Sequence, residues 1–297
     1  MTTPARMLHS TWSPSYADRR APATPADVDA AVELLRGHRV LAITGAGIST
    51  DSGIPDYRGP DAVPRSPMTY QQFVADPGFR RHYWARNHVG WHHMRATRPN
   101  DGHRALARLE QAGVVSGVIT QNVDRLHQAA GARNVVDLHG HYDEVICLDC
   151  GRVISRRELD ARLTALNPDF LDTLDVADVE VAPDADAVIE RTAHFRVASC
   201  EACGGVLKPN IVYFGENVPR ERVARAYEMV DDATAILTAG TSLAVQSGLR
   251  LVRRAARDGK PVVIVNRGVT RGDEHATMRL NAGTSETLTR LAETLAP

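Results

Sequence analysis

The four cysteines of the chain occur as two pairs, Cys147-x-x-Cys150 and Cys200-x-x-Cys203. A CxxC turn directs two thiolates toward one ion, and two such turns supply the four sulfur ligands of a tetrahedral zinc site. A zinc ion with four thiolates has no open coordination position, so it would stabilise the fold and not catalyse. Two disulfides and a redox CxxC are the alternatives. The lack of a secretory signal argues against the first, and the presence of two pairs argues against the second.

A second group of polar residues follows five short apolar runs, at residues 40–43, 114–119, 135–138, 235–237 and 262–265. The runs have the composition of buried parallel strands. Each is followed by small or polar residues: Thr44-Gly45-Ala46-Gly47, Thr120-Gln121-Asn122-Val123-Asp124, His139-Gly140, Gly240-Thr241-Ser242 and Asn266-Arg267-Gly268. In an open parallel sheet, ligands bind outside the carboxyl ends of the strands. We therefore expect these residues to share one site.

His139 is the candidate catalytic base of that site. A histidine has a pKa near neutral pH, so it can accept a proton from a substrate and return it. A lone histidine is more often a hydrogen-bonded structural residue, but His139 ends the third of five converging strands and precedes Gly140. His127, on the helix expected after Asp124, is interpreted as a packing or capping residue and is left out of the site.

The loop Gly45-Ala46-Gly47 has the small residues that let backbone amides approach a pyrophosphate. By itself this is a weak signal, because the third glycine of the G-x-G-x-x-G pattern is missing. An acidic ribose partner about 20 residues further on is not evident either. A hydride-transferring dehydrogenase is therefore the poorer interpretation.

The expected architecture is α/β, with a Rossmann-like parallel sheet in a large domain, a small zinc-binding module and a helical insertion. A helix is predicted to begin at Thr24-Pro25-Ala26-Asp27, and further helices over residues 103–112 and 220–230 separate the strands. The large domain is assigned to residues 1–59, 101–140 and 216–297. Residues 60–100 are assigned to the helical insertion, and residues 141–215 to the zinc-binding small domain.

The charge balance limits the partners of the protein. With 35 basic and 36 acidic residues, there is no net field to attract nucleic acid or a membrane surface. No apolar segment has the length of a signal peptide or of a membrane span. We expect a cytoplasmic protein that binds neither nucleic acid nor membrane.

Longer motifs then identify a family. The chain has TGAGISTDSGIPDYRG at 44–59, TQNVDRLH at 120–127, DLHG at 137–140, KPNIVYFGE at 208–216, GTSL at 240–243 and VNRG at 265–268. Together with the two CxxC pairs, these motifs resemble the signatures of the sirtuins, in the order of that family. The DYRG form and the long insert between the cysteine pairs resemble the class II, mitochondrial-type branch most closely.

The resemblance implies an NAD-dependent protein-lysine deacetylase or deacylase, which releases nicotinamide and O-acyl-ADP-ribose. Protein mono-ADP-ribosyl transfer at the same site is the alternative. A binding module without turnover is disfavoured, because a mere binder needs no base such as His139. The implied partners are acylated-lysine proteins, with acetyl-CoA synthetase as a candidate by analogy.

The resemblance also implies a role for each matching residue. The catalytic residues are His139 and Asn122. NAD would contact Gly45, Ala46, Gly47, Asp56, Tyr57, Arg58, Gln121, Asn122, Asp124, Gly240, Thr241, Ser242, Asn266, Arg267, Gly268 and Thr284. The acyl-lysine segment would contact Val212, Phe214, Gly215 and Glu216, and a structural zinc ion would be held by Cys147, Cys150, Cys200 and Cys203.

The preferred acyl group is less well indicated. Relatives that prefer acidic acyl groups have a tyrosine and an arginine at positions that match Val63 and Ser66 here. Neither residue is present, and Arg65 lies one position off. The sequence therefore gives no support for succinyl or malonyl specificity.

Overall fold

The computed structural model describes residues 21–59, 62, 67–172, 182–183, 185 and 192–297. The chain divides into two compact units. The described residues of the larger unit lie within 12–64, 94–141 and 218–297, and those of the smaller unit within 65–93 and 142–217. The sequence suggested two separate insertions, at residues 60–100 and 141–215. Most of the residues of both belong to the smaller unit.

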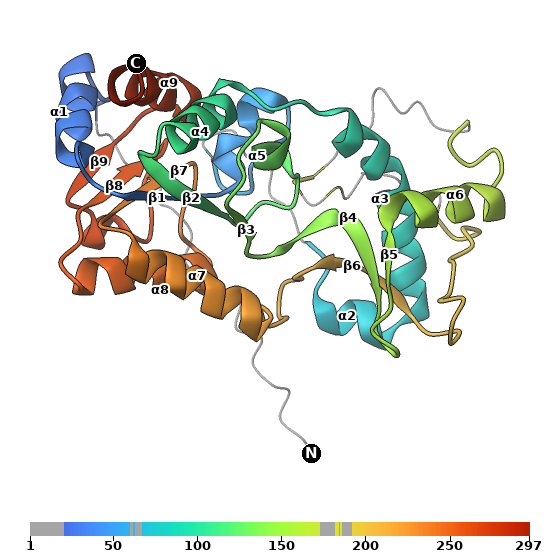
Figure 1. The fold of residues 1–297 in the computed structure, drawn as a ribbon. Coiled ribbons are helices and arrows are strands. Elements are labelled where there is room, and N and C mark those ends of the chain that lie inside the picture. Colours follow the sequence, from blue (N-terminus) through green and yellow to red (C-terminus); the bar gives the residue numbers. More distant parts are fainter. Residues whose placement is uncertain (1–20, 60–61, 63–66, 173–181, 184, 186–191) are drawn as a thin grey trace. The chain divides into compact units, whose positions relative to one another are not determined.

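The larger unit contains a parallel sheet, drawn in Figure 1 with its helices. Among the described residues it has six strands in the order β3-β2-β1-β7-β8-β9. The strand order reverses between β1 and β7, which is the Rossmann arrangement, so the predicted fold class is confirmed. The strands are β1 (Val40–Thr44), β2 (Val115–Thr120), β3 (Val135–Asp137), β7 (Ala235–Ala239), β8 (Val262–Val265) and β9 (Met278–Leu280).

Helices cover both faces of this sheet, and β1 shows how the two layers form. Val40 and Ala42 pack into the core beneath α1, α4 and α9, whereas Leu41 and Ile43 pack into the core beneath α7 and α8. Both faces of the strand are buried, so its sequence is continuously apolar and does not alternate. The helices are α1 (Pro25–Leu35), α4 (Asp101–Gln111), α7 (Arg220–Asp232), α8 (Gln246–Arg257) and α9 (Thr284–Leu295), which Figure 1 labels above and below the sheet.

Local capping explains where two of these helices begin. Thr24 accepts from the Asp27 amide and the Asp27 side chain accepts from the Thr24 amide, a capping box that confirms the predicted start of α1. At α4 the same reciprocal arrangement joins Asn100 and His103. Short helices complete the loops: η1 (Ala46–Ile48), η2 (Thr50–Ser52), α5 (Leu126–Ala129) and η3 (Asp273–His275).

The register of the sheet brings the carboxyl ends of five strands into line. Thr44 pairs with Thr120 and with Ala239, Thr120 pairs with Asp137, and Ala239 pairs with Val265. The loops that follow these strands therefore start at one edge of the sheet, as the sequence predicted.

Two of these loops contain residues in the left-handed region of backbone conformation. Arg125, directly after Asp124, has φ 63°, and Leu243, directly after Ser242, has φ 51°. The left-handed region is disfavoured for side chains other than glycine, and such residues cluster at functional sites. Leu243 is also fully buried.

The smaller unit contains a three-stranded sheet of order β5-β4-β6 and three helices among its described residues. Its core includes Phe73, Tyr83 and Tyr213, whose rings meet edge to face at centroid distances between 5.3 and 5.5 Å. Its elements are α2 (Tyr70–Ala75), most of α3 (Pro77–Ala96), most of β4 (Gly140–Cys147), β5 (Val153–Ser155), α6 (Arg156–Leu166) and β6 (Leu207–Ile211).

No helix in the described part of the chain is both long and apolar enough to cross a membrane.

Candidate active site

The glycines after β1 pack directly against the loop after β7. The Gly47 amide donates to the Gly240 carbonyl at 2.8 Å, and a Cβ on Gly47 would lie only 3.0 Å from the Gly240 backbone. Gly240 has φ +64°, and a Cβ there would lie 2.3 Å from the Ile48 nitrogen. The glycines therefore permit contact between two backbones. The Gly47 amide is bonded within the protein.

Behind this loop, Ser49 joins the polar residues that follow β2. Its hydroxyl donates to Asp124 Oδ2 at 2.7 Å and accepts from Asn122 Nδ2 at 3.0 Å. Burial raises the pKa of Asp124, although hydrogen bonds from the Leu126 amide and from Ser49 favour the carboxylate. The structure thus brings Asn122 and Asp124 together, as predicted, and adds Ser49. Serine is too common for its type alone to have indicated this role.

Two buried histidines lie beside this group. His127 Nε2 lies 2.8 Å from Thr44 Oγ1, and the ring centroids of His127 and His103 are 4.9 Å apart. His103 Nδ1 bonds Asn100 Oδ1 at 3.0 Å. Burial lowers the pKa of His103 to about 4, with a further effect of Arg104, and lowers the pKa of His127 well below its usual value. Both rings are therefore neutral at pH 7.

His139 is held through both ring nitrogens. Nδ1 lies 3.0 Å from the Gln121 carbonyl oxygen, which can only accept, so Nδ1 bears the proton. Nε2 is then the unprotonated nitrogen, and it lies 2.7 Å from Ser247 Oγ. Burial lowers the pKa of His139 to about 4; the Gln121 hydrogen bond opposes this effect and Arg222 adds to it. A neutral imidazole with a lone pair on Nε2 is the form that a general base requires.

Gln121 also connects to the loop after β7. Its Nε2 donates to Thr241 Oγ1 at 2.9 Å. Thr241 is buried, and its hydroxyl accepts from the amide of the strained Leu243. The Ser242 carbonyl accepts from the Arg271 amide at 2.9 Å. The predicted site segments at 120–124 and 240–242 are therefore linked by a side-chain hydrogen bond.

The remaining predicted cofactor residues of this unit lie in three places. After β8, Asn266 Nδ2 donates to the carbonyls of Arg267 and Gly268 at 2.9 and 3.2 Å, which shapes that turn. Thr284, at the start of α9, donates to the Gly47 carbonyl at 3.3 Å and so reaches the first loop. Asp56 caps the Gly59 amide at 2.8 Å. Tyr57 and Arg58 follow Asp56 and are half-buried.

The predicted substrate segment lies in the smaller unit, after β6. The Phe214 carbonyl accepts from the Tyr70 amide at 2.9 Å, and the Gly215 carbonyl accepts from the side chain of Gln71 at 3.1 Å. Gly215 has φ +81°, which favours glycine. Val212, directly after β6, is half-buried.

Glu216 has a partner of its own within the smaller unit. Its Oε2 accepts from Lys208 Nζ at 3.1 Å and from the Tyr213 amide at 2.9 Å. Lys208 is almost fully buried, and its ammonium group lies 4.5 Å from the centre of the Tyr213 ring. These contacts stabilise the segment around Glu216, for which the sequence predicted only contact with the acyl-lysine substrate.

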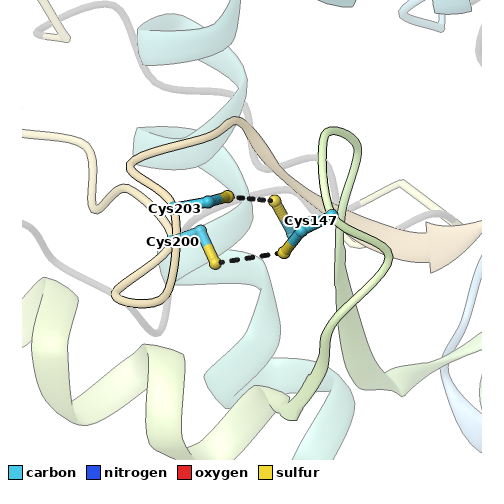
Figure 2. A group of neighbouring side chains, drawn as sticks. Cys147, Cys200 and Cys203 are labelled. Atoms are coloured by element: carbon cyan, nitrogen blue, oxygen red, sulfur yellow. Dashed lines mark hydrogen bonds between the residues drawn. The ribbon is translucent and has the colours of Figure 1, made fainter.

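The four cysteines converge as the CxxC spacing predicted. Cys147 Sγ lies 3.5 Å from Cys203 Sγ, and Cys150 Sγ lies 3.8 Å from Cys200 Sγ. Figure 2 shows the sulfur atoms of the two loops facing one another. A zinc ion bound at about 2.3 Å in tetrahedral geometry holds its sulfurs about 3.8 Å apart, whereas a disulfide needs about 2.0 Å. The separations fit one metal ion and do not fit two disulfides.

A second group of metal-binding residue types occurs in the smaller unit. His88 Nδ1 and His92 Nε2 lie 3.0 and 3.4 Å from Asp160 Oδ1. The guanidinium of the fully buried Arg156 lies 3.6 Å from the same oxygen. Because Arg156 already neutralises this carboxylate and would repel a divalent cation at close range, we assign no metal to the group.

Positions 63, 65 and 66, on which the acyl preference was argued, lie outside the described residues.

The fold and the site define an α/β protein with a polar site at the carboxyl ends of a Rossmann-like sheet and a module that holds a metal through four cysteines. Residues 45–247 match the sequence model of the Sir2 family. The chain belongs to this family, which confirms the resemblance to the sirtuins.

Relatives match most of the chain. An NAD-dependent protein deacetylase 1 from Mycobacterium avium is 59% identical over 90% of this chain and 95% of its own length. An NAD-dependent protein deacetylase 1 from Streptomyces coelicolor is 49% identical over 96% of this chain and 94% of its own. An NAD-dependent protein deacylase from Monosiga brevicollis is 47% identical over 81% and 79%.

Solved structures agree. A chain described as Sir2-p53 peptide-NAD+ is similar with a TM-score of 0.68 and 32% identity, covering 90% of this chain and 98% of that one. Another Sir2 enzyme gives a TM-score of 0.72 with 29% identity over 92% and 98%.

Proposed function

We propose that the protein is an NAD-dependent protein-lysine deacylase that releases nicotinamide and O-acyl-ADP-ribose. The observation that carries this proposal is His139, which is neutral, bears its proton on Nδ1 and keeps a lone pair on Nε2 at the carboxyl edge of the sheet. The names of the relatives, which are deacetylases and deacylases that use NAD, support the same reaction.

In this proposal NAD is a substrate that lies along the strand ends. The loops at Gly45–Gly47 and at Asp56–Arg58 would contact its central part. Gln121, Asn122 and Asp124 would hold the nicotinamide ribose and the carboxamide. The adenosine half would contact Gly240, Thr241, Ser242, Asn266, Arg267, Gly268 and Thr284.

The polar group around Ser49 suits the first step of such a reaction. When nicotinamide leaves and the acyl oxygen bonds to the anomeric carbon, positive charge develops on the ribose. The carboxylate of Asp124 lies in a buried network with Asn122, where charge stabilisation is stronger than in water. Asn122 would orient the carboxamide, which is why we count it with His139 as catalytic.

His139 would serve the second step. Removal of a proton from a ribose hydroxyl makes that oxygen nucleophilic toward the carbon of the acyl group, and water then releases the amine. The Gln121 carbonyl fixes the ring tautomer for this task. Because the ring is neutral well below pH 7, its protonation does not limit activity near neutral pH.

The acyl-lysine would bind after β6, where Val212 and Gly215 would pair with the peptide backbone and Phe214 would contact the lysine methylenes. Backbone pairing gives affinity with little sequence selectivity. The solved relative that contains a p53 peptide supports a peptide substrate. Glu216 would act here through Lys208, by holding the segment in shape.

The four cysteines would hold one structural Zn²⁺. When bound, the ion supplies a crosslink between the loop after β4 and the loop before β6, and it takes no part in acyl transfer. Acetyl-CoA synthetase as a substrate, a cytoplasmic location and membership of the class II branch stay predictions.

The test is incubation of the purified protein with NAD and an acetyl-lysine peptide, followed by mass spectrometry of all products. We expect nicotinamide and O-acetyl-ADP-ribose in equal amounts. His139→Ala should abolish product, whereas His38→Ala, which removes an imidazole at the amino end of β1, should not. ADP-ribose attached to protein with the acetyl group intact would instead establish mono-ADP-ribosyl transfer and refute deacylation.

A further inference from the structure

Ser247 is the one hydroxyl that the described structure places on the basic nitrogen of His139. Its Oγ lies 2.7 Å from Nε2. Since the Nδ1 proton of His139 is directed at the Gln121 carbonyl, Nε2 can only accept, and the Ser247 hydroxyl must be the donor. Ser247 lies outside every motif used to recognise the family.

The position of Ser247 follows from the start of α8. Ser247 is the second residue of that helix and is 6% exposed. The next residue, Gly248, faces the side chain of Gln121, and a Cβ there would lie 3.0 Å from the Gln121 amide. The absence of a side chain at Gly248 lets the first turn of α8 approach the residues after β2. Ser247 is thereby brought within hydrogen-bond distance of His139.

This contact has a consequence for the reaction. An imidazole nitrogen has one lone pair, and the Ser247 proton occupies the lone pair of Nε2. A ribose hydroxyl could reach Nε2 directly only if Ser247 moved away. The Ser247 oxygen, however, retains two lone pairs of its own and can accept a hydrogen bond while it donates one. Ser247 is buried and His139 is half-buried, and the two lie at the start of a helix and just after a strand, which favours transfer of the proton from ribose to Ser247 to His139.

We propose that Ser247 is a further catalytic residue, a hydroxyl relay through which the ribose proton reaches His139. This proposal rests on the proposed function. As the ribose O–H bond breaks, its proton passes to Ser247 Oγ, and the Ser247 hydroxyl proton passes to His139 Nε2. Ser247 ends as it began and the imidazole becomes imidazolium. The ribose oxygen uses its electron pair to form the bond to the acyl carbon, and the π pair of the carbon–nitrogen double bond at that carbon moves onto the lysine nitrogen. No oxidant or further reactant is needed.

The relay can be tested because nicotinamide loss comes before the proton transfer. Exchange of labelled nicotinamide into NAD, in the presence of acetyl-lysine peptide, reports the first step alone. Formation of O-acetyl-ADP-ribose reports both steps. We would compare wild type with Ser247→Ala, which removes the hydroxyl, and with Ser247→Thr, which keeps it. Ser116→Ala is the matched control, because it removes a serine hydroxyl bonded to the Val40 carbonyl at the other end of the sheet.

For Ser247→Ala we expect product formation to fall by about 100-fold, at the lower end of what one positioned proton transfer contributes. Nicotinamide exchange should stay within about threefold of wild type, since the relay acts after that step. Ser247→Thr should keep most of the activity. The rate of product formation should also be measured in mixtures of light and heavy water. For the wild type and for Ser247→Thr, its dependence on deuterium content should indicate that more than one proton moves in the step.

Two results would overturn the relay. Product formation by Ser247→Ala at or above the wild-type rate would show that Ser247 only competes with the substrate for His139. An equal loss of exchange and of product formation would show that Ser247 supports the shape of the site and transfers no proton. A wild-type protein that performs neither nicotinamide exchange nor deacylation would refute the proposed function itself, a result distinct from both.

Discussion

The buried histidines of the larger unit make its stability depend on pH. His103 is fully buried, and burial lowers its pKa from 6.5 to about 4. The folded protein therefore favours the neutral ring more than the unfolded chain does. The resulting stability is fully present above pH 6.5 and is lost as the pH falls toward 4. The drop in pKa corresponds to about 3.4 kcal/mol, at about 1.36 kcal/mol for each pH unit.

Two other histidines change stability with pH in the same direction, and one carboxyl group opposes them. Burial lowers the pKa of His127 and of His139 as well. The pKa of Asp124 is raised, which opposes the trend, because a carboxyl that protonates more readily in the fold gains stability as the pH falls. From His103 alone we therefore expect unfolding of the larger unit to become easier by about 3 kcal/mol between pH 7 and pH 4.

The measurement is amide hydrogen exchange of peptides from β1 and β2, at a series of pH values and corrected for the intrinsic rate. It reports opening of the larger unit without requiring that the whole chain unfold in one step. The critical variant is His103→Gln. We expect its free energy of unfolding to be lower than that of the wild type at pH 7. Below pH 6.5, however, this free energy should fall less steeply than in the wild type, by up to about 1.4 kcal/mol for each pH unit. A slope equal to that of wild type would refute the argument.

Three further predictions concern the loops and the smaller unit. Gly240→Ala places a Cβ 2.3 Å from the Ile48 nitrogen at φ +64°. It should therefore lower the stability measured by thermal unfolding by about 1–3 kcal/mol and weaken the NAD binding measured by calorimetry. An unchanged melting temperature would contradict the close contact. Cys200→Ser should reduce the zinc content of the purified protein from one ion per chain to nearly none by elemental analysis, and retention of a full equivalent would exclude the four-cysteine site. Lys208→Met should destabilise the smaller unit by about 2 kcal/mol. This is less than the cost of removing one partner of a fully buried ion pair, because the Glu216 side chain is 23% exposed. Adding Glu216→Gln should recover part of this loss in denaturant unfolding, and no recovery would show that the pair is not coupled.

The strands and their ends were predictable because a strand that is buried on both faces has a continuous run of apolar residues. The runs at β1 and β8 are apolar without interruption, and the register places the polar residues that follow them along one edge. The cysteine spacing was equally direct. In contrast, β9 (Met278–Leu280) has three residues and an arginine at its centre, and it becomes a strand only because β8 offers an edge.

The hydroxyl groups of the site were not predictable in the same way. Ser49 and Ser247 are common residues with no characteristic spacing, and their partners lie 73, 75 and 108 positions away in the chain. Only the fold brings them together. The joining of residues 65–93 with 142–217 into one unit is also a property of tertiary packing that no local pattern announces.

Leu243 has a consequence for the evolution of this loop. A left-handed backbone costs an L-residue other than glycine about 1–2 kcal/mol, so glycine would relax the turn. The leucine side chain, however, is fully buried in the core beneath α7 and α8, and its removal would leave a cavity. Asparagine would tolerate the turn but would bury an amide there. Few single substitutions are therefore neutral at this position, and drift at Leu243 should require compensating changes in the core around it.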